Sequence, residues 1–295
     1  MKKHYKILYF FIVLVFLLTA CGTSQDQSEE KSKQSEKVSY DRIISLMPSN
    51  TEILYELGLE KRIIGVSTVD DYPKEVKNKK QFDAMKLNKE KLLKAKPDLI
   101  LAHESQKATS ADILDTLKDN GVKVVYVKDA QSINKMYDTF KQIGKVTDKE
   151  KEAEKLIKET KQNIKEVKAS VPEDTKSERV FMEVSSEPEI YTAGKNTFFD
   201  DMLTQLNAKN SFADLDGWSK VSKEDIIKEN PDVMISTMGL SKEAYQKVLQ
   251  QRGGFNEINA VQENRVESVD GNKISRPGPR IDDGLKALKK AIYKE

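Results

Sequence analysis

The stretch KEKLLKAKPDLILA, residues 89–102, returns as KEDIIKENPDVMIS at residues 223–236, and this repeat decides the fold. Both copies read Lys-Glu, any residue, two aliphatic residues, Lys, two residues, Pro-Asp and three apolar residues. The pattern predicts a short helix stopped by the proline and followed at once by a buried strand, which is half of an α/β unit. Two such units 134 residues apart predict two similar lobes, although this pattern also recurs by chance in α/β proteins.

Both copies carry matching signals where the helix is expected to begin. Asn88 and Ser222 can each cap a helix N-terminus, and an apolar residue precedes each of them. Glu90 and Glu224 then fall in the first turn, where the helix dipole favours a carboxylate. Solvated first-turn glutamates are the plain interpretation, but their recurrence in two lobes favours a paired role. Two carboxylates on two lobe tips suit two basic patches on a two-fold symmetric partner.

Apolar strands alternate with amphipathic helices on both sides of the repeat, which is typical of βαβ units and a largely parallel sheet. Strands are expected at residues 42–47, 63–66, 99–102, 122–127, 179–184, 233–236 and 265–269. Helices are expected at residues 48–57, 110–120, 197–206, 242–251 and 280–293, besides those of the repeat.

Residues 148–169 contain neither Gly nor Pro and repeat apolar or small side chains at steps of three and four, which predicts a helix of about 22 residues. The predicted fold class is therefore α/β: two α/β lobes with mostly parallel central sheets, joined by a single long backbone helix. The expected boundaries are 42–147 for the N-terminal lobe, 148–171 for the backbone helix and 172–295 for the C-terminal lobe.

Residues 1–20 have the pattern of a lipoprotein signal peptide. Three lysines precede twelve apolar residues, fewer than the ~20 that a membrane span needs. The sequence Leu-Thr-Ala-Cys at residues 18–21 resembles a bacterial lipobox, which implies cleavage before Cys21 and lipid on Cys21; a secretory signal without lipid is the alternative. The sixteen residues after Cys21 contain no apolar side chain, so residues 21–41 are expected to be a lipidated cysteine and a flexible tether.

Composition excludes several classes of function. The formal charge is +2, and it is −1 without residues 1–20; a near-neutral, charge-rich surface argues against a nucleic-acid partner. Beyond residue 20 the chain has one histidine, His103, and one cysteine, Cys21, so a Cys-His catalytic pair, a His-rich zinc site and a disulfide are excluded or severely limited. G-x-S-x-G, G-x-x-x-x-G-K-[ST] and H-E-x-x-H are all absent, which argues against catalysis.

Loop residues near the ends of predicted strands are candidate ligand contacts, because ligands bind beyond the carboxyl ends of parallel strands. The candidates are Tyr72, Met85, His103, Tyr191, Trp218 and Arg276. Trp218, the only tryptophan, is expected in a loop, with a core position as the alternative; His103 has a structural loop role as its alternative. Arg276 lies beside proline turns that would aim its guanidinium at an anionic or amide group. Arg280 begins a helix against the dipole and therefore needs a carboxylate or carbonyl partner.

Five short motifs together carry a family resemblance. They are SLMPSNTE at 45–52, DYP at 71–73, KPDL at 96–99, YTAGK at 191–195 and PRI at 279–281. Across about residues 42–295 the chain resembles the substrate-binding proteins of ABC importers for cobalamin and iron complexes, whose lobes are joined by one rigid backbone helix. The motifs are closest to the cobalamin-binding branch.

The resemblance implies a lipid-anchored protein on the extracytoplasmic face of the cell membrane. It implies capture of a small organometallic ligand, a corrinoid (cobalamin-like) or iron complex, between the lobes, and delivery to an ABC permease and its ATPase, with no catalysis and no cofactor of its own. A glutamate on each lobe contacts arginines of the permease in this family; the matching positions are Glu90 and Glu224. Aromatic side chains sandwich the ligand in the cobalamin branch; Tyr191 and Trp218 match two of them.

Two positions depart from that branch and keep other ligands open. Val69 and Ala84 stand where its members carry aromatic residues, so haem and ferric siderophores remain alternatives. Haem would take an axial ligand from His103, a methionine or a tyrosine. From other classes of function, an anchored hydrolase using Asp70 and Asp71, or a surface adhesin or scaffold, are the alternatives; adjacent aspartates are more often a turn or helix cap.

Overall fold

The computed structural model describes residues 39–172 and 176–293, which belong to one compact unit. The predicted signal peptide, Cys21 and most of the predicted tether lie outside these residues. Within the described part of the chain, no helix combines the length and the apolar character that crossing a membrane requires.

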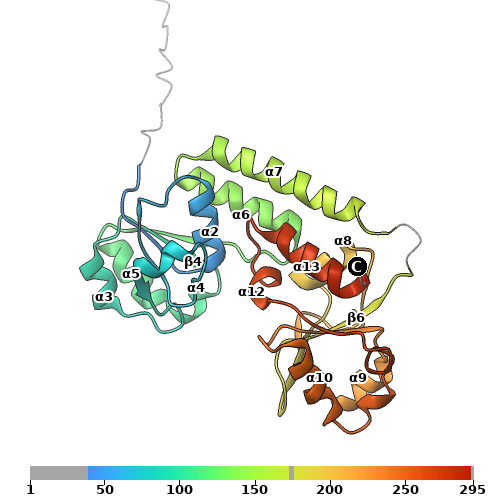
Figure 1. Cartoon of the computed structure of the whole chain (residues 1–295). Helices are drawn as coiled ribbons and strands as arrows, with labels where there is room; N and C mark the ends of the chain where they lie inside the picture. Colours follow the sequence, from blue (N-terminus) through green and yellow to red (C-terminus); the bar gives the residue numbers. More distant parts are fainter. Residues whose placement is uncertain (1–38, 173–175, 294–295) are drawn as a thin grey trace, which may run out of the picture. The chain divides into compact units, whose positions relative to one another are not determined.

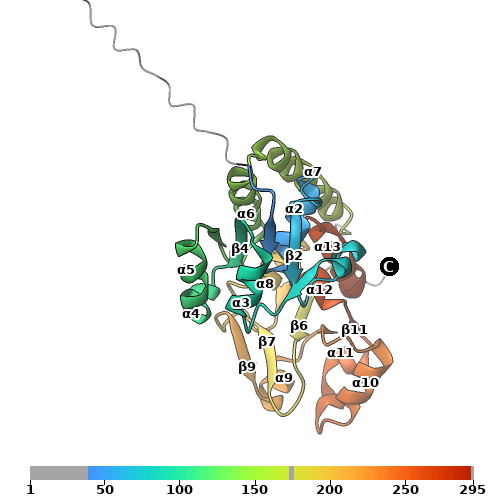
Figure 2. The ribbon, with the colours of Figure 1, turned by 90° about the vertical axis from the view of Figure 1, so that its left-hand side faces the viewer.

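The first sheet has five parallel strands in the order β3-β2-β1-β4-β5. Its strand β4 is labelled in Figure 1, and β2 and β4 are labelled in Figure 2. Its strands are β1 Ile43–Ser45, β2 Ile63–Ser67, β3 Lys80–Phe82, β4 Leu99–His103 and β5 Lys123–Val127. The helical segments between them are α2 Pro48–Glu56, η1 Lys74–Asn78, α3 Lys89–Ala95, α4 Gln106–Thr109 and α5 Ala111–Asp119. Alternate residues of β4 enter two different apolar clusters, because successive side chains of a strand point to opposite faces. Both faces of this central strand are therefore buried, as its unbroken apolar sequence indicates.

The second sheet has four parallel strands in the order β11-β10-β6-β8. They are β6 Arg179–Glu183, β8 Lys209–Asn210, β10 Val233–Ser236 and β11 Val266–Ser268. A separate antiparallel pair joins β7 Ile190–Ala193 to β9 Trp218–Val221. The helical segments of the second lobe are α8 Phe198–Gln205, α9 Lys223–Glu229, α10 Lys242–Gln250, η2 Phe255–Glu257, α11 Asn259–Gln262, α12 Gly271–Ile274 and α13 Ile281–Tyr293. The predicted α/β class with mostly parallel sheets is confirmed; the antiparallel pair was not expected.

The repeat folds as a helix and strand in both copies, and both predicted caps are present. Asn88 accepts a hydrogen bond from the backbone of Lys91 at 2.9 Å, and Ser222 accepts one from the backbone of Asp225 at 3.0 Å. Both helices end before their prolines, as predicted. The C-cap residues Lys96 and Asn230, which directly precede Pro97 and Pro231, adopt left-handed backbone with φ of 49° and 42°.

The aspartates of the repeat, Asp98 and Asp232, make equivalent hydrogen bonds in both copies. The carboxylate of Asp98 accepts the backbone N–H of Arg42 at 3.0 Å, and that of Asp232 accepts the backbone N–H of Arg179 at 2.9 Å. Each bond ties the start of the repeated strand, β4 or β10, to the start of its parallel neighbour, β1 or β6. The two lobes therefore share this side-chain hydrogen bond as well as the order of helix and strand.

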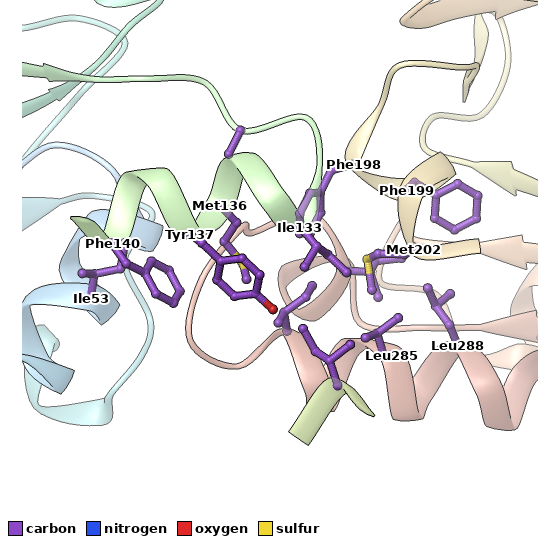
Figure 3. Packing of buried hydrophobic residues seen from close by; sticks show 14 of the residues in the cluster. Ile53, Ile133, Met136, Tyr137, Phe140, Phe198, Phe199, Met202, Leu285 and Leu288 are labelled. Carbon is purple, nitrogen blue, oxygen red and sulfur yellow. The ribbon is translucent and has the colours of Figure 1, made fainter. Parts of the chain in front are cut away.

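Two packed helices connect the lobes. α7 Glu150–Ala169 is the predicted long backbone helix, and α6 Ile133–Val146, which was not predicted, lies beside it (Figure 1). Gly144 permits the close approach, because a Cβ there would lie 2.6 Å from the Cβ of Ala153. Figure 3 shows Phe140 of α6 beside Ile53 of α2, and Ile133 of α6 near residues of α8; all belong to one apolar cluster. This shared core joins the two lobes through side-chain packing as well as through the chain.

Candidate functional site

A cavity of about 570 Å³ lies where the carboxyl ends of strands from both sheets converge. Ser49 and Asn50 follow β1, His103 ends β4, and Thr237 follows β10. The other lining residues are Met47, Val127, Lys128, Asp129, Ala130, Gln131, Thr139, Met182, Val184, Phe198, Phe199, Trp218, Gly271, Asn272, Ile274, Ser275 and Pro277. Its volume falls within the roughly 300–1,000 Å³ that small-molecule and cofactor sites occupy, and it mixes apolar walls with a few polar groups.

The cavity includes two of the six predicted ligand contacts. Trp218 and His103 line it, whereas Tyr72, Met85, Tyr191 and Arg276 are not among its lining residues. Trp218 is the first residue of β9, so the expectation of a loop is wrong. β9 pairs with β7, which lies too far away in the sequence for local sequence patterns to predict the pairing. Tyr191 lies diagonally across this strand pair, on the same sheet face as Trp218, because Tyr191 pairs with Lys220 and Ala193 pairs with Trp218.

Among residues 39–172 and 176–293, four large apolar side chains are exposed. They are Val69, Tyr72, Met85 and Trp218. Met85 is 90% exposed and is not among the residues that line the cavity. The ring of Tyr72 lies under the guanidinium of Arg280, 3.7 Å from it, so this tyrosine is held by a cation–π contact.

His103 has both ring nitrogens engaged within the chain. Nδ1 lies 2.8 Å from the hydroxyl of Ser105, and Nε2 lies 3.5 Å from the carboxylate of Asp129. A metal centre would have to displace one of these partners to use the imidazole as an axial ligand. Across residues 39–172 and 176–293, no group of three or more His, Cys, Asp or Glu residues is arranged to hold a metal ion.

A charged cluster beside the cavity links the two lobes. Glu52 of α2 accepts two bonds from Arg280, at 2.5 and 2.9 Å, and its side chain is 2% exposed. Arg276 pairs with Asp71 at 2.5 Å and lies 3.6 Å from Glu52. Arg280 therefore has the carboxylate partner that its position at a helix start required. Arg276, predicted to face a ligand, is instead directed at protein carboxylates.

The two aspartates proposed for a hydrolase are occupied structurally. Asp70 accepts bonds from the backbone and hydroxyl of Ser67, at 2.9 and 2.5 Å, and burial raises the pKa of its carboxyl. Asp71 bonds to Arg276 and to the amide of Asn272. Neither aspartate lines the cavity, so the geometry gives no support to a catalytic pair there.

Glu90 and Glu224 lie in the first turns of α3 and α9, and both side chains are exposed. No ion pair within the described residues involves either carboxylate. They are therefore accessible to another molecule, and their docking role stays a prediction.

Several cavity residues were missed by sequence reasoning. Ser49 and Asn50 lie in the first turn of α2, which follows β1, and Lys128 and Asp129 directly follow β5, with Gln131 in the same loop. The rule that ligands bind beyond strand ends would have found these residues. Phe198 and Phe199 begin α8 and carry no comparable local signal.

Two α/β lobes joined by a long helix, with a cavity at converging strand ends, define a two-lobed binding protein. The sequence matches the family described as periplasmic binding protein over residues 43–272, and the chain belongs to that family. It is 40% identical to the uncharacterized ABC transporter substrate-binding lipoprotein YvrC of Bacillus subtilis, over 99% of this chain and 98% of the relative. It is 29% identical to the vitamin B12-binding protein of Vibrio parahaemolyticus, over 81% and 85% respectively.

Solved structures show the same fold. A possible iron-binding (periplasmic solute-binding) protein of Staphylococcus epidermidis is 65% identical with a TM-score of 0.82, covering 87% of this chain and 100% of the other. The vitamin B12-binding protein BtuF of Vibrio cholerae is 24% identical with a TM-score of 0.72, covering 85% and 96%, and shows the fold alone. Because the family and its relatives are substrate-binding proteins of ABC transporters, the chain is a binding protein and not an enzyme, as predicted.

Proposed function

We propose that this protein is a lipid-anchored, extracytoplasmic receptor that captures a corrinoid or an iron complex and delivers it to an ABC permease and its ATPase. The observation that carries the proposal is the cavity of about 570 Å³ built from strand ends of both lobes. A ligand there touches both halves of the chain at once, as a two-lobed receptor requires. Relatives named as vitamin B12-binding and as possible iron-binding proteins support this ligand class.

The aromatic walls favour a large, flat ligand. Phe198, Phe199 and Trp218 line the cavity, and Tyr191 lies on the same sheet face as Trp218. Aromatic side chains provide large apolar area with few rotatable bonds, and their faces stack on flat rings. A corrinoid is therefore the first candidate and haem the second; the observation that favours haem is the presence of His103 in the cavity wall.

Titration of the purified protein with cyanocobalamin, cobinamide, haemin and ferric siderophores tests the proposal. Trp218 is the only tryptophan, so quenching of its fluorescence reports occupancy of the cavity directly. Calorimetry and the absorption spectrum of protein purified from its own host identify the ligand independently. Absence of binding to every compound refutes the receptor function.

The haem alternative has its own test. If His103 supplies the axial ligand, His103→Ala shifts the haem absorption band and weakens haemin binding. Cobalamin binding through stacking on Trp218 is expected to change little in the same variant. An unchanged haem spectrum in His103→Ala excludes this residue as the ligand.

Docking is tested separately from binding. The double variant Glu90→Ala/Glu224→Ala is expected to abolish uptake while leaving ligand affinity unchanged, because both carboxylates are exposed and outside the cavity. The matched control is Glu154→Ala/Glu166→Ala, which removes two exposed glutamates from α7. Equal loss of uptake in both pairs contradicts specific docking, and a loss of affinity in the first pair places those glutamates in the binding site. Release of Cys21→Ser from membranes tests the predicted anchor.

A further inference from the structure

We propose that the N-terminal turn of α2 and the side chain of Asn50 form an oxyanion subsite of the cavity. It receives a carboxylate or phosphate oxygen of the bound ligand. This inference rests on the proposed function, because it assigns a polar contact to the same cavity. It adds a chemical requirement that the aromatic walls alone do not impose.

The first observation is a helix start that is not capped by the protein. α2 is nine residues long, and its N-cap residue Met47 offers no side-chain acceptor. Pro48 at the first helical position has no N–H, and the first bond to the helix start runs from Thr51 N–H to the Met47 carbonyl at 3.1 Å. The backbone N–H groups of Ser49 and Asn50 therefore have no intrahelical acceptor.

These free donors belong to the cavity wall. Met47, Ser49 and Asn50 all line the cavity. A helix N-terminus combines unsatisfied N–H groups with a partial positive charge, and so favours an anionic oxygen. In this fold the helix start is therefore directed to the place where the ligand is bound.

The second observation is independent of the helix. Asn50 is only 2% exposed, and its amide nitrogen Nδ2 is buried without any hydrogen-bond partner among the described residues. A buried donor without an acceptor is destabilising, and native proteins rarely retain one without a reason. Because Asn50 lines the cavity, an acceptor atom of the ligand is the partner that this amide lacks.

The carboxylates nearest to the subsite already have partners. Glu52, one turn along α2, is paired with Arg280, and Asp71 is paired with Arg276. The charges of these carboxylates are balanced by arginines of the protein, so neither carboxylate needs a cationic group of the ligand as a partner. The cavity wall also contains the ammonium of Lys128 and the carboxylate of Asp129, which accepts a hydrogen bond from Gln131 at 2.6 Å. At the start of α2 itself the unmatched groups are N–H donors, which favour an acceptor oxygen.

The experiment compares ligands with and without a free oxyanion. Cyanocobalamin carries a phosphodiester, together with the rest of its nucleotide, that cobinamide lacks, and haemin carries two carboxylates that its dimethyl ester masks. The effect of the Asn50 variants on the preference within each pair therefore decides the role of the oxyanion. For the pair that binds, the member with the free oxyanion is expected to bind the wild-type protein roughly tenfold or more tightly. A preference within the cobalamin pair indicates that the subsite binds a phosphate oxygen, and a preference within the haem pair indicates that it binds a carboxylate oxygen.

Two variants test Asn50 itself. Asn50→Leu removes the donor, and Asn50→Asp places a carboxylate at the same position with almost no change in shape. Both are expected to abolish the preference within the ligand pair, and Asn50→Asp is expected to weaken binding of the oxyanion member most, by roughly 100-fold. Asn120→Asp is the matched control, because Asn120 is exposed and is not among the residues that line the cavity.

Thermal unfolding of the unliganded variants separates a ligand role from a structural one. A buried donor without an acceptor does not stabilise the protein without ligand, so Asn50→Leu, which removes the donor, is expected to melt no lower than wild type. Asn50→Asp is left out of this comparison, because burial of its carboxylate lowers stability by itself. A lower melting temperature for Asn50→Leu shows that the amide has a structural partner and overturns the inference. An unaltered ligand preference in both variants overturns it equally. If no compound binds wild type, the proposed receptor function is refuted. The melting temperatures still show whether the amide of Asn50 has a hydrogen-bond partner within the protein.

Discussion

Glu52 is predicted to be the residue whose loss most weakens the contact between the two lobes. Its buried carboxylate pairs with Arg280 at 2.5 and 2.9 Å and lies 3.6 Å from Arg276. Glu52→Ala leaves Arg280 without its counter-charge, and removing one partner of a buried pair costs about 3–5 kcal/mol. Because Arg280 is 19% exposed, the lower end, about 3 kcal/mol, applies. At about 2–4 °C per kcal/mol for a protein of this size, the melting temperature should fall by about 6–12 °C.

Circular dichroism during heating and urea unfolding measure this change. A double-mutant cycle with Glu52→Gln, Arg280→Met and the pair isolates the ionic contribution, because the double variant carries no unpaired charge. The double variant is expected to cost clearly less than the sum of the single variants. Lys118→Ala, which breaks an exposed pair with Asp115, is the control and should cost under about 1 kcal/mol.

Two results would refute the argument. A fall of less than about 2 °C in Glu52→Ala would mean that solvent replaces the lost contact, as at an exposed ion pair. Additive single and double variants would mean that Glu52 and Arg280 act through different neighbours rather than through each other.

Asn88→Ala and Ser222→Ala each remove a helix cap and should cost about 1 kcal/mol, seen as a fall of about 2–4 °C in melting temperature; no change would contradict the capping role. Burial raises the pKa of Asp70 above its ordinary 3.8, so the folded state prefers the proton, and stability relative to Asp70→Asn should fall as pH rises from about 4 towards 7. Urea midpoints across this range check the sign, and a wild-type midpoint that rises relative to that of Asp70→Asn with increasing pH would contradict it. Arg252→Met leaves the fully buried Glu183 without its cation and should cost about 3–5 kcal/mol by urea unfolding; Glu183→Gln in the same background should restore part of the loss.

Local signals were enough to predict the repeated unit and the long helix. Caps, prolines and apolar periodicity act over a few residues, so they can be recognised from sequence alone. α6 was missed although Met136, Tyr137, Phe140 and Ile143 repeat at helical spacing, so the local signal for this helix was present in the sequence. The pairing of β7 with β9 depends on contacts between segments far apart in the chain, which no local pattern encodes.

Two of the predicted ligand contacts line the cavity. His103 ends a repeated strand, where the rule for strand ends expects a ligand, and Trp218 was expected from the family resemblance. Arg276 looked equally promising, because its proline-rich loop would orient a guanidinium. Its partner Asp71 lies 205 positions away in sequence, and only the folded chain brings the two charges to 2.5 Å. Charge pairing across such separations depends on the assembled lobes and not on the residues beside each arginine.

The repeat also relates binding to docking in space. A helix that precedes a strand in an α/β unit runs antiparallel to it, so the helix start lies at the same edge of the sheet as the strand's carboxyl end. Glu90 at the start of α3 therefore lies at the edge where β4 ends in His103, and Glu224 has the same relation to Thr237 beyond β10. A partner that contacts both glutamates faces the edge at which the cavity lies. Under the proposed function, one duplicated unit would supply both the wall of the cavity and the contacts that align it with a permease.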